Sequence, residues 1–145
     1  MKKRISLFAL LALIAFTMFT ACTPDDDNTN EDNTRLVGTW IQQEVSPTAL
    51  MATFFFEADG TGRYKEEKVN ADTSNKAIFR AFNFDFDGEL LTIQFTQEGD
   101  GYNYLCSLNG DQMTLTTTAY VYKDGHVDSY TEPEVRVFKR TAKNN

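Results

Sequence analysis

Strict alternation of apolar and polar residues runs through most of the chain after position 34 and limits its fold more than any other feature. Large apolar side chains occupy every second position over long stretches, as in Phe82, Phe84 and Phe86, or in Leu91, Ile93 and Phe95. Period two is the repeat of a β-strand with one buried face, whereas a helix places apolar residues three and four apart. The stretch 34–145 is therefore predicted to be all-β.

Turn-forming residues interrupt the alternation at short intervals. Asp87-Gly88, Asn109-Gly110 and Asp124-Gly125 supply the positive φ angles that two-residue hairpins need, so consecutive strands should pair antiparallel as a meander. Pro133 has no N–H for a ladder and should mark a bulge or an edge in the last strand. The strands are expected at about 37–45, 50–57, 62–69, 77–86, 90–97, 102–108, 113–122 and 126–140.

Eight strands in meander order bury one face best by closing into a barrel, which also removes exposed sheet edges. The expected fold is thus an eight-stranded antiparallel up-and-down barrel. The competing architecture is an immunoglobulin-like sandwich, which would place its core tryptophan on a middle strand with flanking cysteines. Here Trp40 lies on the first predicted strand and no cysteines flank it.

Residues 1–21 have the layout of a secretory signal peptide. Lys2, Lys3 and Arg4 precede an apolar stretch from Ile5 to Phe19. That stretch is shorter than the roughly 18 to 20 residues that would span a bilayer core. We therefore interpret 1–21 as a cleaved segment rather than as a membrane helix.

Phe19-Thr20-Ala21-Cys22 resembles the bacterial lipobox, although Phe19 replaces the usual leucine. The resemblance implies that Cys22 becomes the first residue of the mature chain and carries fatty acyl chains such as palmitate. Each buried methylene contributes about 0.8 kcal/mol, so such chains would hold the protein at a membrane. The expected location is then the cell envelope, as an outer-membrane lipoprotein. The alternative is an ordinary signal peptide that ends by chance at a cysteine.

Residues 23–33 contain no large apolar side chain, so 22–33 is predicted to be a disordered acidic tether. Asp25-Asp26-Asp27 also resembles the acidic export signal of surface-exposed lipoproteins in some Gram-negative bacteria. Both interpretations of the acids stay open. The tether would join the anchor to one domain at 34–145, a length that can bury its own core.

The charge balance disfavours some partners. Without the three cations of the leader, 11 Lys and Arg face 21 Asp and Glu, a net charge near −10. Nucleic acid and anionic membrane surfaces both attract clustered Lys and Arg, so neither is an expected partner. With Cys22 lipidated, Cys106 has no cysteine partner for a disulfide. No sequence feature indicates an oligomeric state.

Three short motifs together resemble lipocalin-like domains: Gly38-Thr39-Trp40 at the first strand, residues 56–62 at the first hairpin, and Val137-Phe138-Lys139-Arg140 at the closing strand. The resemblance covers about 34–140. It implies that Trp40 packs at the closed end of the barrel and that Arg140 lies over it. It also implies a pocket for a small apolar or amphipathic molecule.

The expected pocket wall consists of inward aromatic side chains, namely Phe54, Phe56, Phe82, Phe84, Tyr64, Tyr102 and Tyr104. Parity places Arg80 on the same face, where it could receive a ligand carboxylate; the alternative is an arginine at the rim, in water or in a local ion pair. A second class of function stays open, because fold alone does not decide it. It is an envelope accessory or protein-interaction module with a filled barrel.

No residue pattern indicates an enzyme. His126 is the single histidine, and although Asp128 shares its strand face, no nucleophile is placed against it. One histidine and one free cysteine do not make a zinc site either. We therefore expect no catalytic residues, no metal and no cofactor.

Overall fold

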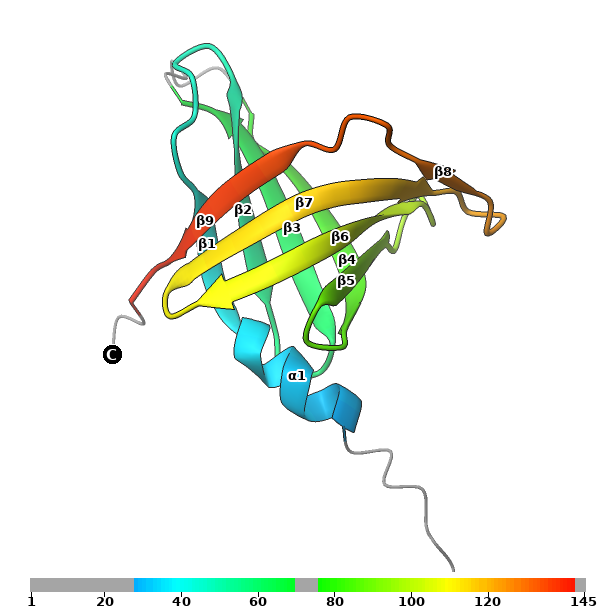
Figure 1. The fold of residues 1–145 in the computed structure, drawn as a ribbon. Coiled ribbons are helices and arrows are strands. Elements are labelled where there is room, and N and C mark those ends of the chain that lie inside the picture. The colour runs from blue at the N-terminus through cyan, green and yellow to red at the C-terminus, as the bar shows by residue number, and fades with distance from the viewer. Residues whose placement is uncertain (1–27, 70–75, 143–145) are drawn as a thin grey trace, which may run out of the picture.

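The computed structural model describes residues 28–69 and 76–142. The predicted signal segment 1–21, the predicted lipidation site Cys22 and the run Asp25-Asp26-Asp27 lie outside the described residues. The described chain forms one helix followed by nine strands (Figure 1). Within it, no helix has the length and apolar character needed to cross a membrane.

Eight of the strands form a closed antiparallel ring. Consecutive strands pair from β1 to β7, and β9 pairs with both β7 and β1, which closes the ring; β8 lies outside it and pairs with β7 (Figure 1). The predicted eight-stranded antiparallel up-and-down barrel is confirmed, and it is consistent with a lipocalin-like fold. The strands are β1 (Gly38–Gln42), β2 (Leu50–Phe56), β3 (Thr61–Lys68), β4 (Ile78–Phe86), β5 (Leu90–Phe95), β6 (Gly101–Asn109), β7 (Gln112–Val121), β8 (Val127–Ser129) and β9 (Val135–Arg140).

Two predicted strands differ from the structure. The expected strand 126–140 is divided in two, because β8 ends at Ser129 and β9 begins at Val135. Pro133 lies in the gap, which fits a residue that cannot donate to a ladder. The first strand was expected to reach 45 but ends at Gln42, and Glu44 just beyond it has a φ of 53°, outside the range of a strand.

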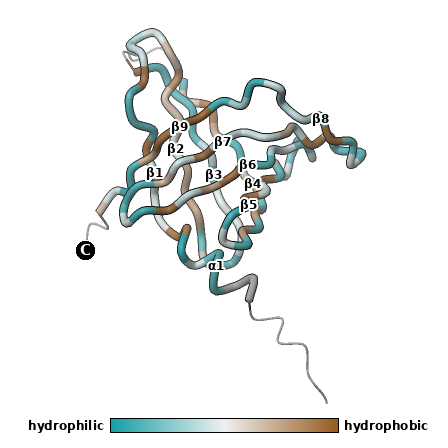
Figure 2. The backbone as a smooth tube through the Cα atoms, viewed as in Figure 1, coloured by the Kyte–Doolittle hydropathy of each residue, from teal (hydrophilic) through white to brown (hydrophobic). Residues whose placement is uncertain are grey.

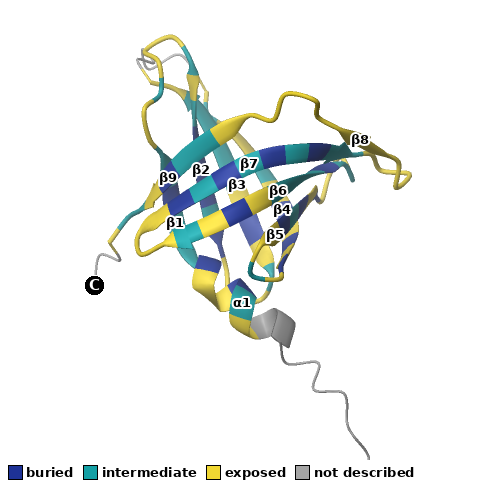
Figure 3. Ribbon diagram, in the orientation of Figure 1, coloured by how far each residue is buried: buried dark blue, intermediate teal, exposed yellow. Residues whose placement is uncertain are grey.

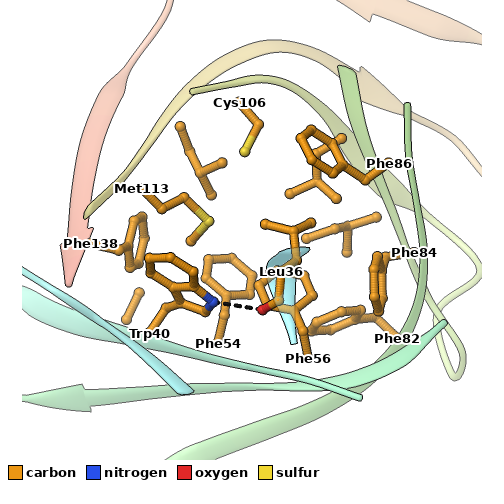
Figure 4. Close-up of a cluster of buried hydrophobic side chains, with 14 of the residues drawn as sticks. Leu36, Trp40, Phe54, Phe56, Phe82, Phe84, Phe86, Cys106, Met113 and Phe138 are labelled. Atoms are coloured by element: carbon orange, nitrogen blue, oxygen red, sulfur yellow. Dashed lines mark hydrogen bonds between the residues drawn. The ribbon is translucent and has the colours of Figure 1, made fainter. Parts of the chain in front are cut away.

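The sequence alternation becomes an alternation of buried and exposed residues along the strands (Figure 3). In β4, Phe82, Phe84 and Phe86 are buried while Asn83 and Asp85 between them are exposed. The inward rings pack against one another in the barrel interior (Figure 4). Phe56 is central to this core, with its ring centroid 5.5 Å from that of Phe82 and 4.9 Å from that of Phe84, both edge to face.

Helix α1 (Asn28–Leu36) covers one end of the barrel (Figure 1). The prediction of a disordered tether up to position 33 is therefore wrong for its last residues. Most of α1 is polar, as Figure 2 shows, yet its inner side is anchored: Leu36 is fully buried, and the Oδ1 atom of Asn33 accepts a hydrogen bond of 2.9 Å from the Phe86 N–H. These long-range contacts hold a segment whose composition alone indicates disorder.

Trp40 and Arg140 lie together at this covered end. The guanidinium carbon of Arg140 is 4.4 Å from the Trp40 ring centroid, in the arrangement that the family resemblance implied. The Trp40 indole N–H donates to the Leu36 carbonyl at 2.7 Å (Figure 4). Arg140 donates to the Arg35 carbonyl at 2.6 Å, so a single side chain of β9 contacts both β1 and the last turn of α1. We call this end of the barrel the closed end.

Candidate functional site

A pocket of about 290 Å³ opens at the other end of the barrel. Phe86, at the C-terminal end of β4, contacts α1, whereas Arg80, near the start of the same strand, lines the pocket. The pocket is therefore at the opposite end of the barrel from α1, which we call the open end. Its walls are Phe54, Tyr64, Glu66, Arg80, Phe95, Tyr102, Tyr104, Thr117, Tyr130, Glu132, Glu134 and Arg136.

Five of the eight predicted ligand-binding residues line this pocket: Phe54, Tyr64, Arg80, Tyr102 and Tyr104. The other three, Phe56, Phe82 and Phe84, do not, and that part of the prediction is wrong. They point inward as parity required, but they belong to the packed core between the pocket and α1. Strand parity determines the face of a side chain and leaves its depth along the barrel open.

The base of the pocket is aromatic. Phe54 is buried and lies 5.0 Å from Tyr64 between ring centroids, and Tyr64 lies 6.2 Å from Phe95. Phe95 in turn is 6.3 Å from Tyr102. These rings present an apolar floor with phenol hydroxyl groups at its edges, a surface suited to an amphipathic molecule.

Arg80 lies at the pocket wall in a pairing of its own. Its guanidinium carbon is 5.1 Å from the Phe95 ring centroid, and its Nε is 3.7 Å from Glu98 Oε1. Both side chains of this ion pair are well exposed, so solvent screens the pair. Arg80 thus lines the pocket and forms a local ion pair at the rim, while its expected role as a receiver of a ligand carboxylate stays a prediction.

Arg136 is a second guanidinium in the pocket, one that the sequence analysis did not single out. It donates to Glu134 Oε2 at 2.8 Å, and this hydrogen bond raises the pKa of Arg136 and lowers the pKa of Glu134. The Arg136 Nε atom is buried and has no hydrogen-bond partner among the described residues. A buried donor without a partner is costly, by about 1 to 3 kcal/mol, and marks a place where an acceptor would be stabilising.

Three tyrosines of the pocket, Tyr64, Tyr102 and Tyr104, have raised pKa values. Burial raises the pKa of Tyr64 to about 12, with a further contribution from nearby Glu66, whose Oε1 accepts the Tyr64 O–H at 3.1 Å. Burial also raises the pKa of Tyr102 and of Tyr104. The three phenols are therefore neutral around neutral pH, and because the Tyr64 O–H already donates to Glu66, the Tyr64 oxygen remains as an acceptor.

The segment between β8 and β9 forms the remaining wall and was missed by the sequence analysis. Its backbone is held against β7, because the Tyr130 N–H donates to the Thr118 carbonyl at 2.8 Å and the Thr117 N–H donates to the Glu134 carbonyl at 2.9 Å. Tyr130, Glu132 and Glu134 line the pocket from this segment. Arg136 lies on the same strand face as Phe138 and Arg140, so the sequence pattern could have identified it as inward. Glu134 lies before the start of β9, where the alternation of a strand no longer applies.

The single histidine lies on the exposed β7–β8 hairpin, away from the pocket walls. His126 Nε2 is 3.0 Å from Asp128 Oδ1, on the shared face that the sequence predicted, and the Tyr122 O–H donates to Asp128 Oδ2 at 2.9 Å. In the described part of the chain no group of three or more His, Cys, Asp and Glu is placed to hold a metal ion. Burial raises the pKa of the Cys106 thiol to about 12, which keeps this residue of the core unreactive.

The chain matches no protein-family model, no curated protein and no solved structure in the three comparisons made.

Proposed function

We propose that this chain is an exported, lipid-anchored lipoprotein of the cell envelope whose lipocalin-like barrel binds a compact amphipathic molecule at its open end. The observation that carries the binding proposal is the pocket: its volume is about 290 Å³ and its walls combine aromatic rings with convergent polar groups. Ligand pockets range from about 300 to 1,000 Å³, so this one suits a small ligand. The closed end, by contrast, is filled by side chains.

Binding is tested by thermal unfolding of the mature chain with fatty acids, their methyl esters, sterols and saccharides. A ligand that binds only the native state raises the melting temperature, and the rise grows with the logarithm of the ligand concentration above Kd. The matched variant is Thr117→Phe, which places a ring in the pocket at a small, buried lining position. Stabilisation of the wild type that is lost in folded Thr117→Phe supports the proposal; no stabilisation by any compound contradicts it.

The same panel tests whether Arg80 selects a carboxylate. If it does, acids stabilise the protein more than their esters, and Arg80→Met removes that difference. Arg63→Met is the matched control, because Arg63 lies on the outer side of β3, over Phe55. Equal responses to acids and esters would exclude a carboxylate role for Arg80.

The proposed anchor at Cys22 rests on the basic, apolar and small residues that precede it. Cys22→Ala should abolish labelling by a fatty-acid analogue and release the protein from membranes. Unchanged labelling of Cys22→Ala would refute the anchor.

A second candidate function, a protein-interaction module, has one observation in its favour. Leu105 pairs with Leu90 across β5 and β6, and Thr116 connects Leu105 to Val135 across β7 and β9. The three apolar side chains of this row are 39 to 59% exposed on the outer surface. Leu105→Glu should then reduce association with a partner, while ligand binding at the open end is unchanged.

A further inference from the structure

A row of aromatic side chains leads out of the pocket towards the β7–β8 hairpin. We call Tyr102, Tyr120, Tyr122 and His126 the aromatic row. Successive ring centroids in it are 5.2, 4.7 and 5.5 Å apart. Tyr102 lines the pocket, whereas Tyr122 is 42% exposed and His126 is exposed on the hairpin. Aromatic surface therefore continues from the pocket along an extended path.

Carboxylates accompany the aromatic row along its edge. The Tyr120 O–H donates to Asp100, and the Tyr122 O–H donates to Asp128, which also lies against His126. Carboxylate oxygens of Asp100 and Asp128 therefore lie next to successive rings of the aromatic row. A ligand on the row would meet apolar ring surface and hydrogen-bonding groups side by side and at short intervals.

Four of the five charged side chains described in the pocket lining already have an internal partner. Arg136 pairs with Glu134, Arg80 lies 3.7 Å from Glu98, and Glu66 accepts from Tyr64. Among the described residues, the lining contains three carboxylates against two guanidinium groups, so these residues offer no excess of positive charge. An anionic ligand would have to compete with these internal partners, whereas an uncharged ligand leaves them in place.

Two polar atoms at the open end have no hydrogen-bond partner among the described residues: the donor Arg136 Nε and the acceptor Asp100 Oδ1. Arg136 lines the pocket together with Tyr102, and Asp100 accepts from Tyr120, whose ring packs against that of Tyr102. One is a donor and the other an acceptor, and both are shielded, so neighbouring side chains must rotate to expose them. A hydroxyl group both donates and accepts, and therefore suits either atom.

We infer that the ligand of the open end is a short saccharide, with one end in the pocket and further sugar units along the aromatic row. A sugar ring has an apolar C–H face that stacks on aromatic rings and an edge of hydroxyl groups for the carboxylates. In a chain of neutral sugars, each unit presents such an apolar face and such a hydroxyl edge, and none carries a charge. This inference rests on the proposed function and specifies its ligand class.

The test is calorimetric titration of the mature chain with cello-, malto- and chito-oligosaccharides, from the monosaccharide to the hexasaccharide, at low and high salt. Affinity should rise with length in at least one series and should change little with salt, because no ion pair forms with the ligand. Tyr122→Ala should weaken the longer saccharides roughly three- to tenfold, the loss of one aromatic contact, and leave the shortest binder unchanged.

Phe79→Ala is the matched control, because Phe79 is an exposed aromatic residue next to pocket-lining Arg80 but outside the aromatic row. It should bind saccharides as the wild type does. If no saccharide binds while another compound stabilises the wild type and not Thr117→Phe, the saccharide inference is overturned and the proposed function stands. If neither a saccharide nor any other compound binds, both fail. Saccharide binding that Tyr122→Ala and Phe79→Ala affect equally would overturn the role of the aromatic row.

Discussion

At the scale of single residues, Arg140 is the side chain that connects the elements of the closed end. Its guanidinium lies over the Trp40 ring and also donates to the Arg35 carbonyl in the last turn of α1. A cation over an indole contributes about 0.5 to 2 kcal/mol, and a cation at a helix C-terminus satisfies a free carbonyl. One side chain therefore joins β1, β9 and α1.

We predict an energetic coupling between Trp40 and Arg140. In a double-mutant cycle of Trp40→Phe and Arg140→Ala, the free energies of unfolding should differ from additivity by about 1 kcal/mol. The measurement is urea unfolding followed by circular dichroism. Additive effects within error would show that the two side chains are neighbours without a net interaction.

Tyr64 gives a second prediction at this scale. Its pKa is about 12 in the folded chain against an ordinary value of 10, mainly through burial. Below pH 10 the phenol is neutral in both states; between pH 10 and 12 the unfolded chain loses the proton and the folded chain keeps it. The free energy of unfolding should therefore fall as pH rises through this window.

The variant that isolates this contribution is Tyr64→Phe. The stability difference between wild type and Tyr64→Phe should decrease as the pH rises from 10 towards 12, because only the wild type loses the contribution of Tyr64. Urea unfolding at several pH values measures it. Parallel curves for the two proteins over this range would contradict the assigned cause.

At the scale of elements, α1 acts as the cover of the closed end. The helix is short and polar, and isolated helices of such length are marginal in water. Its position depends on tertiary contacts, above all the buried Leu36 and the hydrogen bond from the Phe86 N–H to Asn33. The start of the folded domain is therefore determined by long-range contacts rather than by helix propensity.

Replacing Asn33 should show this dependence. Asn33→Ala leaves the buried Phe86 N–H without its acceptor, which costs about 1 to 3 kcal/mol. Thr34→Ala, on the exposed side of the same helix turn, should change stability by less than about 0.5 kcal/mol. Chemical unfolding of both variants measures these losses. Equal small losses would mean that the hydrogen bond between Asn33 and Phe86 does not contribute to stability.

At the scale of the whole molecule, the barrel has two different ends. Side chains fill the closed end beneath α1, while the open end keeps a pocket with a mixture of aromatic and charged walls. The inward side chains of β4 illustrate the change: Phe82, Phe84 and Phe86 are core, and Arg80 is pocket wall. The proposed binding function belongs to one end only.

The sequence predicted the barrel and most of the strands because period two and the hairpin turns are local signals. It also predicted that the alternating aromatic residues of β2, β4 and β6, such as Phe54, Phe82 and Tyr102, face inward. It did not predict how far along the barrel axis each side chain lies. Phe56, Phe82 and Phe84 were therefore expected in the pocket wall, although they belong to the packed core. The contact of Asn33 with Phe86 joins residues far apart in the chain, and no local pattern carries that information.

The central claim, that the open end binds a compact ligand, is tested most directly by nuclear magnetic resonance titration of the mature chain with the compound that stabilises it best. We predict that the largest changes in amide chemical shift occur at Tyr64, Tyr102, Tyr104 and Arg136. The amide signals of residues at the closed end, such as Trp40 and Phe86, should not change. Shifts concentrated at the closed end, or spread over the outer surface, would contradict the claim.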